Sequence, residues 1–400
     1  MVKKIYAILF FVLIITASVL NIAFLGSNDF SGRENRELAK LPSVSVKSIA
    51  SGEYFKGLDA FFNDRFIQRD NLVKLSSEIK SGIAKYGVKS IISDDRIKNI
   101  SVLKLEPGEN PVVRYKDNVY FVFDGNKAQI NRYTKAVNFV SYSLEDVNVS
   151  VMLVPTALEF VENSSEIFGI SSQRNMLDRA SVTLNKNIAF IDVYDTLKAY
   201  SDEYIYFKSD HHWTILGAYY SYCQLSGVFG FEPVQFRPEL AGRFCGSFAD
   251  FTNSQDVLEL TDIMSTQIIE TQYWCHGGKA KASDAVQMRD MYPEEFEGYK
   301  RILGGDTGYI RIETMNKTDR RLLVIKDSYA NALLPYLTEH YNRIITVDPR
   351  YFEGNLYETV RDEKITDVLF VNNTETISDD MYIEMLENLA GKTSYLERKE

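Results

Sequence analysis

The chain contains four histidines, and two of them are adjacent in the run Asp210-His211-His212-Trp213. A carboxylate two residues before an imidazole can accept the ring N–H, fix the tautomer and leave the other ring nitrogen free as a general base. Spacing alone does not decide whether His211 or His212 would be that base. The alternative interpretation is that Ser209 or Asp210 only caps a helix that begins near Trp213.

A serine lies where a predicted buried strand turns into a predicted helix. Residues 322–325 form a continuous apolar run, residues 329–339 have a helical pattern, and Ser328 falls between them. Open α/β sheets bind ligands at the carboxyl edge of their strands, and backbone N–H groups at a helix start can stabilise an oxyanion. Because a serine hydroxyl needs a base to become a nucleophile, we expect Ser328 to pair with the Asp-x-His run. Alternatively, Asp327 or Ser328 serves only as a helix cap.

Asp210-His211-His212-Trp213 is the signature of the DHHW proteins, and the chain resembles this family and the related SGNH-hydrolase-like alginate and polysaccharide O-acetylation proteins. In that group an Asp-x-His pair precedes the block with the nucleophilic serine. The resemblance therefore assigns Asp210, His212 and Ser328 to a catalytic triad and prefers His212 over His211. Other stretches that look like blocks of the family are residues 33–38, 64–70, 304–306 and 323–352.

Two features depart from the wider SGNH pattern. Lys326 stands where those enzymes carry the glycine of Gly-Asp-Ser, and the Gly-x-Asn-Asp block that supplies their oxyanion asparagine is not found intact. Asn331 is our first candidate for that role, because it follows the serine by three residues and would lie on the first helical turn. The helical spacing around Trp213 favours a place in the core. The further oxyanion or substrate-binding candidates are Gly305, Asn372, Asn373, His211 and Trp213.

The resemblance implies serine-dependent transfer of an acyl group, most simply acetyl, to a cell-surface polysaccharide through an acyl-enzyme. Ser328 would be the nucleophile, His212 the general base and acid, and Asp210 the group that orients the imidazole. It also implies an acetyl donor delivered by a membrane-bound O-acyltransferase, and neither a cofactor nor a metal. The alternatives are a secreted carbohydrate acetylesterase with the same residues, a non-catalytic carbohydrate-binding or assembly module on the same fold, or a membrane-anchored scaffold.

Short apolar runs alternate with helical patterns from about residue 91 to the end of the chain. This alternation predicts an α/β domain with a mostly parallel sheet covered by helices on both faces, and the resemblance implies the SGNH-like three-layer form. The segment from about 232 to 318 is polar and rich in turns, so we interpret it as a long insertion that shapes the site. The predicted strands are 119–123, 149–154, 189–193, 322–325, 344–347 and 368–371, and the predicted helices are 127–143, 213–229, 329–339 and 378–389.

The composition argues against some classes of function. With 400 residues, of which 45% are hydrophobic, the chain can bury a large core. Its net charge of −10 and the lack of a basic run argue against nucleic acid as a partner. Three cysteines without CxxC spacing argue against a zinc site. A disulfide between Cys245 and Cys275 is the less favoured alternative to free thiols.

The amino terminus contains an apolar run from residue 5 to residue 25, directly after two lysines. Its length suits a membrane-crossing helix, and the preceding lysines favour a cytoplasmic amino terminus. We therefore predict a signal-anchor over residues 1–26, a largely helical juxtamembrane region over 27–90, and the main domain over 91–400 on the extracytoplasmic side. The alternative is a cleaved signal peptide, which would also export the domain.

Overall fold

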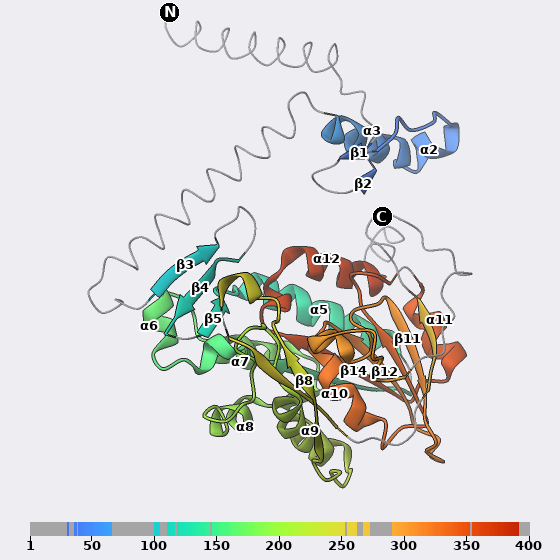
Figure 1. Cartoon of the computed structure of the whole chain (residues 1–400). Coiled ribbons are helices and arrows are strands. Elements are labelled where there is room, and N and C mark those ends of the chain that lie inside the picture. Colours follow the sequence, from blue (N-terminus) through green and yellow to red (C-terminus); the bar gives the residue numbers. More distant parts are fainter. Residues whose placement is uncertain are drawn as a thin grey trace, which may run out of the picture. The chain divides into compact units, whose positions relative to one another are not determined.

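The structure is a computed structural model, and the chain divides into two compact units. The described residues up to 65 belong to the first unit, and those from 100 onward belong to the second (Figure 1). The residues that the structure describes are 30–31, 36–37, 39–65, 100–104, 110–116, 118–144, 146–252, 254–261, 267–272, 290–352 and 354–391.

Among its described residues, the first unit contains a short antiparallel strand pair and two helices: β1 (Phe30–Ser31), β2 (Arg36–Glu37), α2 (Val46–Ala50) and α3 (Glu53–Asp64). α3 ends at Asp64. The Asp64 carboxylate then accepts a hydrogen bond from the backbone N–H of Ala39 (2.8 Å). The predicted anchor lies outside the described residues. Across the residues that are described, no helix combines the length and the apolar character needed to cross a bilayer.

The second unit is built on a seven-stranded sheet in the part of the chain that is described, with the order β10-β11-β13-β12-β14-β6-β7. The strands from β13 to β7 are parallel, whereas β11 pairs antiparallel with β13 and β10 pairs antiparallel with β11. The bounds are β6 (Asn148–Val154), β7 (Ala189–Asp192), β10 (Gln267–Gln272), β11 (Tyr309–Glu313), β12 (Arg321–Lys326), β13 (Arg343–Val347) and β14 (Asp367–Asn373).

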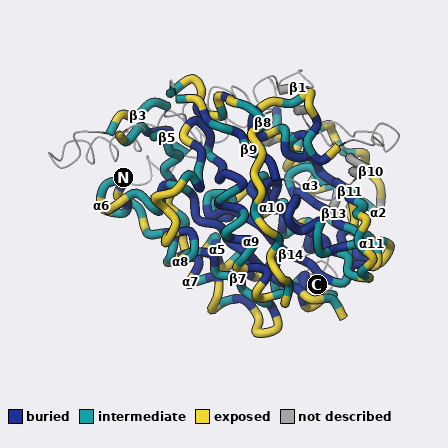
Figure 2. Tube along the Cα trace, turned by 60° about the horizontal axis from the view of Figure 1, so that its bottom comes forward, coloured by how far each residue is buried: buried dark blue, intermediate teal, exposed yellow. Residues whose placement is uncertain are grey.

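Helices cover both faces of this sheet, as Figure 1 shows. Side chains alternate across a strand, so Val324 of β12 packs into one core and Leu323 into the other. Figure 2 shows buried residues in the interior of the fold and exposed residues on the outer loops. The central strands are buried on both faces, and every residue of β14 is buried. This confirms the predicted α/β class with a mostly parallel sheet. One helix layer holds α8 (Tyr194–Ala199), α9 (Ile215–Phe229) and α10 (Ala330–Leu337), and the other holds α5 (Lys127–Ser143), α7 (Gln173–Thr183), α11 (Leu356–Glu363) and α12 (Asp380–Leu389).

The predicted strand at 119–123 forms outside the main sheet. It is β5 (Asn118–Phe121), which pairs antiparallel with β4 (Val112–Tyr115), and β4 pairs with β3 (Ile100–Lys104). β4 and β5 are joined by so short a turn that they pair with each other, and Val113 packs against Leu158 and Phe168. Expecting this run to lie in the parallel sheet was therefore wrong.

The segment from 232 to 318 contributes to the sheet as well as to the loops around it. It contains the antiparallel hairpin of β8 (Pro238–Phe244) and β9 (Asp256–Thr261), and then β10 and β11, which extend the main sheet. β11 was not predicted, because its burial alternates: Ile310 and Ile312 are buried and Arg311 is not. Cys223 and Cys245 are free thiols among the described residues, and Cys275 lies outside them.

Candidate active site

Asp210, the acidic residue in the turn before α9, does not cap that helix. Thr214 is the N-cap, and its hydroxyl accepts the backbone N–H of Gly217 (3.3 Å). Ser209 is instead held by Asp256, whose Oδ2 accepts both the backbone N–H and the hydroxyl of Ser209 at 2.6 Å. The interpretation that Ser209 or Asp210 caps this helix is therefore wrong.

Ser328 lies in the turn between β12 and α10, at the carboxyl edge of the sheet. The N-cap of α10 is Tyr329, so neither Asp327 nor Ser328 caps this helix, and Asp327 is hydrogen-bonded through both carboxylate oxygens. Its Oδ1 accepts the N–H of Tyr329 (2.9 Å) and its Oδ2 accepts the backbone N–H of Asn373 (2.8 Å). Asp327 is fully buried, whereas Ser328 is partly exposed. The serine hydroxyl is therefore available for another contact.

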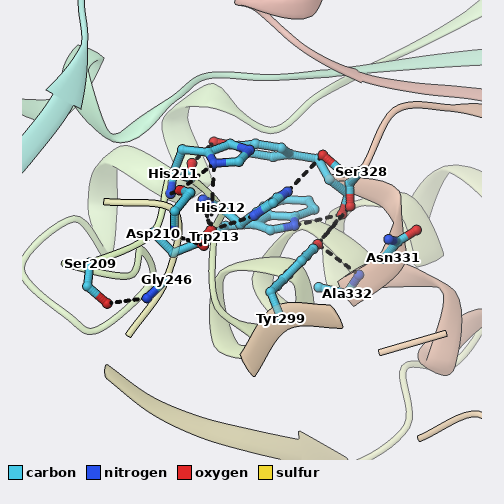
Figure 3. Close-up of polar contacts among 12 residues, drawn as sticks. Ser209, Asp210, His211, His212, Trp213, Gly246, Tyr299, Ser328, Asn331 and Ala332 are labelled. Carbon is cyan, nitrogen blue, oxygen red and sulfur yellow. Dashed lines mark hydrogen bonds and ion pairs between the residues drawn. The ribbon is translucent and has the colours of Figure 1, made fainter. Parts of the chain in front are cut away.

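The structure brings three of the predicted site residues into one hydrogen-bonded chain (Figure 3). His212 Nε2 lies 2.7 Å from Ser328 Oγ, and His212 Nδ1 lies 2.5 Å from Asp210 Oδ1. The same Asp210 oxygen also accepts the His212 backbone N–H (3.0 Å). A proton on Nδ1 satisfies the carboxylate, so Nε2 presents its lone pair to the hydroxyl. This chain can take a proton from Ser328.

Asp210 is held in its ionised form. Burial alone would raise the pKa of its carboxyl, but the charge and hydrogen bond of His212, the charge of His211 and the Ser247 N–H lower that pKa far below its ordinary value. The Ser247 N–H donates to Asp210 Oδ2 at 2.8 Å. At Gly246 an added Cβ would lie 2.3 Å from the Asp210 Cβ, so this position needs glycine to let the carboxylate sit there.

His211 makes different contacts from its neighbour. Its Nδ1 lies 2.8 Å from Ser247 Oγ, and its ring lies edge-on to Phe121 (5.8 Å between ring centroids). Burial, together with the charge of His212, lowers the pKa of His211 below its ordinary value. The ring that meets Ser328 is therefore His212, which is the choice that the DHHW resemblance favours.

The ligand atoms of Asp210, His211 and His212 lie within 4.8 Å of one another. They are the one such group in the described ranges that could hold a metal ion. Both imidazole Nδ1 atoms are already hydrogen-bonded, to Ser247 and to Asp210. A metal bound through these Nδ1 atoms would displace the contact that orients the His212 imidazole.

Tyr299 is a part of this site that the sequence did not predict. It comes from the 3-10 turn η5 (Gly298–Arg301), and its ring stacks on the His212 imidazole with 3.8 Å between centroids and 11° between planes. Its hydroxyl donates to the carbonyl oxygen of Ser328 (2.9 Å) and accepts the N–H of Ala332 (3.3 Å). Tyr299 thus buttresses both the base and the turn that carries the serine. Nothing in the spacing of residues near 299 signals these contacts.

The other predicted candidates have mostly structural contacts. Trp213 is fully buried and its indole N–H donates to the Tyr329 carbonyl (2.8 Å), which confirms the core interpretation and excludes a substrate-binding face. The Gly305 N–H donates to the Ile302 carbonyl (3.4 Å) within a turn, where Gly305 has a positive φ of 92°. In each of these residues the bond occupies the N–H group that would otherwise bind a substrate.

Among the asparagine candidates, two are fully engaged inside the core. Asn372 bonds to the hydroxyls of Tyr133 and Tyr382, and the Asn373 amide donates to Asp327 (3.1 Å). Asn331 is buried as well. Its Nδ2 lies 3.3 Å from Asp306 Oδ1, and its Oδ1 accepts no hydrogen bond among the described residues. The unused group of Asn331 is an acceptor, whereas an oxyanion needs a donor, so the oxyanion role of Asn331 stays a prediction.

A cluster of four charged side chains lies next to this site, at the carboxyl edge of β12 and β13. Lys326 Nζ lies 3.2 Å from Asp306 and 3.9 Å from Asp348, while Arg350 bonds to Asp306 (3.0 Å) and Asp348 (2.6 Å). Burial would raise the pKa of Asp306, but Lys326 and Arg350 lower it overall. Lys326 has no exposed surface, so the residue that replaces the usual glycine is an internal ion-pair partner.

The chain belongs to the DHHW family, because the family model described as DHHW protein matches residues 104–347. This confirms the resemblance on which the assignment of Asp210, His212 and Ser328 was based. The match identifies the family of the chain. The roles of the individual residues are inferred from the geometry of the site. No curated protein sequence matches the chain.

Two solved structures illustrate the likeness. A DHHW family protein from Eubacterium siraeum is 27% identical, with a TM-score of 0.61, and the match covers 72% of this chain and 98% of that one. Bacillus cereus PatB1 with a sulfonyl adduct is 20% identical, with a TM-score of 0.55, and the match covers 68% of this chain and 98% of that one. The second likeness shows a shared fold.

Proposed function

We propose that this chain is a serine-dependent acyltransferase that moves an acyl group, most simply acetyl, onto a cell-surface polysaccharide. The observation that carries the proposal is the continuous chain from Asp210 Oδ1 through His212 to Ser328 Oγ, with links of 2.5 and 2.7 Å. Ser328 is partly exposed at the carboxyl edge of the sheet, where open α/β folds bind their ligands.

The chemistry is a double displacement with a covalent intermediate. The Ser328 hydroxyl gives its proton to His212 Nε2 and its oxygen attacks the acyl carbonyl. His212 then returns the proton to the leaving group, and the acyl ester on Ser328 results. An acceptor hydroxyl next gives its proton to His212 and attacks that ester, and the protonated His212 restores the serine. Asp210 stays ionised and stabilises the imidazolium in both halves.

The cellular setting is part of the same proposal. The apolar run over residues 5–25 supports a membrane anchor with the catalytic domain on the extracytoplasmic side. The DHHW and SGNH resemblance supports a membrane-bound O-acyltransferase as the source of the acetyl group. A protein tethered beside that partner would receive the acetyl group at the membrane and pass it to the polysaccharide.

The test starts from the full chain purified in detergent. We expect turnover of 4-nitrophenyl acetate and an acetyl adduct on Ser328, detected by peptide mass spectrometry after a rapid acid quench. PatB1 has been solved with a sulfonyl adduct, so an aryl sulfonyl fluoride is a second probe that should label Ser328. The matched controls are Ser328→Ala, which should carry neither adduct, and His212→Ala, which should react far more slowly.

Two results would change the proposal. An unmodified Ser328 with both probes, in a folded protein, would remove the catalytic claim and favour a non-catalytic carbohydrate-binding module. An adduct that is resolved by water at the same rate with or without glycan acceptors would identify an acetylesterase instead of a transferase.

A further inference from the structure

A cleft of about 400 Å³ lies on the second unit beside the candidate site. Its walls come from three segments: the β4–β5 hairpin, the turn η2 (Ala157–Phe160) with the residues that follow it, and the loop over residues 201–208 after α8. A volume of this size is within the range of pockets that hold ligands of several hundred daltons. The catalytic chain described above does not use it.

The lining of the cleft combines aromatic rings with groups that form hydrogen bonds. The rings are those of Tyr115, Tyr120, Phe160, Tyr204, Tyr206 and Phe207. Aromatic rings cover apolar C–H faces, while amide, hydroxyl and charged groups bind hydroxyls. A chain of sugars presents both kinds of surface in alternation, so this lining suits a glycan better than an apolar or a purely ionic ligand.

The charges around the cleft argue for an uncharged glycan. Two lysines, Lys116 and Lys208, face three carboxylates, those of Glu162, Asp202 and Glu203. A polyanionic chain would be attracted by two of these groups and repelled by three, so it would gain no net attraction. Neutral sugars can hydrogen-bond to both kinds of group without such a penalty.

Two of the tyrosines are fixed before any ligand arrives. The Tyr206 hydroxyl donates to the Pro155 carbonyl (2.6 Å), and the Tyr204 hydroxyl donates to Asp256. Asp256 also holds Ser209, the residue directly before the catalytic Asp210. One buried carboxylate therefore supports both the cleft wall and the catalytic turn. A pre-formed wall lowers the entropy cost of binding.

A smaller cavity of about 20 Å³ adjoins the cleft on the side of the catalytic turn. The two share Val119, Tyr120, Ala157 and Phe207 as wall residues, and the smaller cavity is also lined by Asp210 and His211. Such a volume has room for about one water molecule or one hydroxyl group. Ser328 lines neither cavity, so a sugar in the cleft would lie beside the catalytic turn and not at the reacting hydroxyl.

We infer that this cleft is a subsite for an uncharged part of the acceptor glycan, one or more sugars away from the hydroxyl that is acylated. The inference rests on the proposed acyltransferase function for its biological meaning, but binding in the cleft can be measured without catalysis. Remote binding of this kind raises kcat/KM for long acceptors and leaves short ones unchanged.

The cleft is tested with the full chain in detergent and with a blocking variant, Asp202→Trp, at an exposed position of the cleft. The matched control is Asp362→Trp on α11, another exposed aspartate outside the cleft. Isothermal titration with a neutral chitopentaose should show binding to the wild type, to Ser328→Ala and to Asp362→Trp, and at least tenfold weaker binding to Asp202→Trp. An oligouronate of the same length should bind more weakly than chitopentaose to the wild type.

The kinetic arm uses 4-nitrophenyl acetate as donor with acceptors of one and five sugars. We expect Asp202→Trp to lower transfer to the pentasaccharide about tenfold, while transfer to the single sugar and turnover of the donor stay at the wild-type level. Equal binding of chitopentaose by Asp202→Trp and wild type, absent binding by the wild type, or preference for the oligouronate would each overturn the subsite. Loss of the Ser328 adduct with cleft binding intact would instead overturn only the acyltransferase proposal.

Discussion

Two groups of polar side chains meet at the carboxyl end of β12 and are built in opposite ways. Ser328 belongs to a chain with a single carboxylate, an imidazole and a hydroxyl. Lys326, two residues earlier, belongs to a cluster of two cations and two carboxylates. The first group ends on a partly exposed oxygen, whereas Lys326 has no exposed surface at all.

The two groups differ in whether a proton can move within them during a reaction. In the catalytic chain, a proton can move between Ser328 and His212 because a neutral imidazole accepts it. In the cluster, burial would raise the pKa of Asp306 and lower that of Arg350, but the opposite charges around them outweigh it, so these two groups keep their charges. We interpret the first group as catalytic. We interpret the second as an ion-pair cluster that stabilises the loops carrying Asp306, Asp348 and Arg350.

The largest expected effect is that of Asp210→Asn on activity. Asp210 accepts hydrogen bonds on both oxygens, from His212 and from the Ser247 N–H. In one orientation the asparagine NH2 group meets the two N–H groups of His212, and in the other it meets the Ser247 N–H, so a donor faces a donor in both. A change of imidazole tautomer relieves only the ring contact, and it removes the free Nε2. We expect kcat/KM for 4-nitrophenyl acetate to fall about 10³- to 10⁴-fold with little loss of stability. A fall of less than tenfold would show that Asp210 does not orient the base.

The second prediction concerns the cluster. Lys326→Met leaves Asp306 and Asp348 to share Arg350, and breaking a buried ion pair typically costs about 3–5 kcal/mol. We expect a loss of that size in the free energy of unfolding, measured in denaturant, and a smaller change in activity than for Asp210→Asn. The variant therefore tests whether the cluster contributes to stability and not to catalysis.

The matched control for Lys326→Met is Arg361→Met. Arg361 pairs with Asp362 on the surface, where the two side chains are 70% and 65% exposed, so its loss should not change stability measurably. If Lys326→Met instead keeps its stability and loses as much activity as Asp210→Asn, the cluster takes part in the reaction and the contrast between the two groups fails.

The third prediction tests whether a titrating carboxyl outside both groups affects the fold near the site. Glu375 lines the small cavity beside Asp210 and accepts a hydrogen bond from Asn110 (2.8 Å). Burial raises its pKa to about 7. The folded chain therefore binds this proton more tightly than the unfolded chain does, so the contribution of Glu375 to stability is most favourable below about pH 4.5 and falls as the pH rises to about 7.

Glu375→Gln keeps the acceptor oxygen and removes the titration. We expect the variant to be more stable than the wild type at pH 8, by at most about 3 kcal/mol, and to match it at pH 4.5. Glu166→Gln, at an exposed glutamate, is the control and should show no such difference. A constant difference at both pH values would mean that Glu375 acts through packing and not through its charge.

The sequence could predict the features that are local or rare. Ser328 follows a continuous apolar strand, and the Asp-His-His run holds half of the histidines in the chain. Strand β11 was not predicted because one of its faces is partly exposed, so apolar and polar residues alternate along it. A search for continuous apolar runs does not detect such a strand. Tyr299, Gly246 and Ser247 could not be predicted, since their roles depend on contacts with residues far away in the chain.

The smallest expected effect is that of Tyr299→Phe, which tests how Tyr299 supports the catalytic chain. The phenylalanine keeps the ring on His212 but loses the bond to the Ser328 carbonyl (2.9 Å). We expect a loss of about 1 kcal/mol in unfolding free energy and a fall of a few fold in kcat. Tyr299→Leu also removes the stacking, and it should lower kcat further because the imidazole is no longer held in its plane. If both variants lose the same activity, the hydroxyl alone holds the Ser328 turn, and the ring has no part in positioning the base.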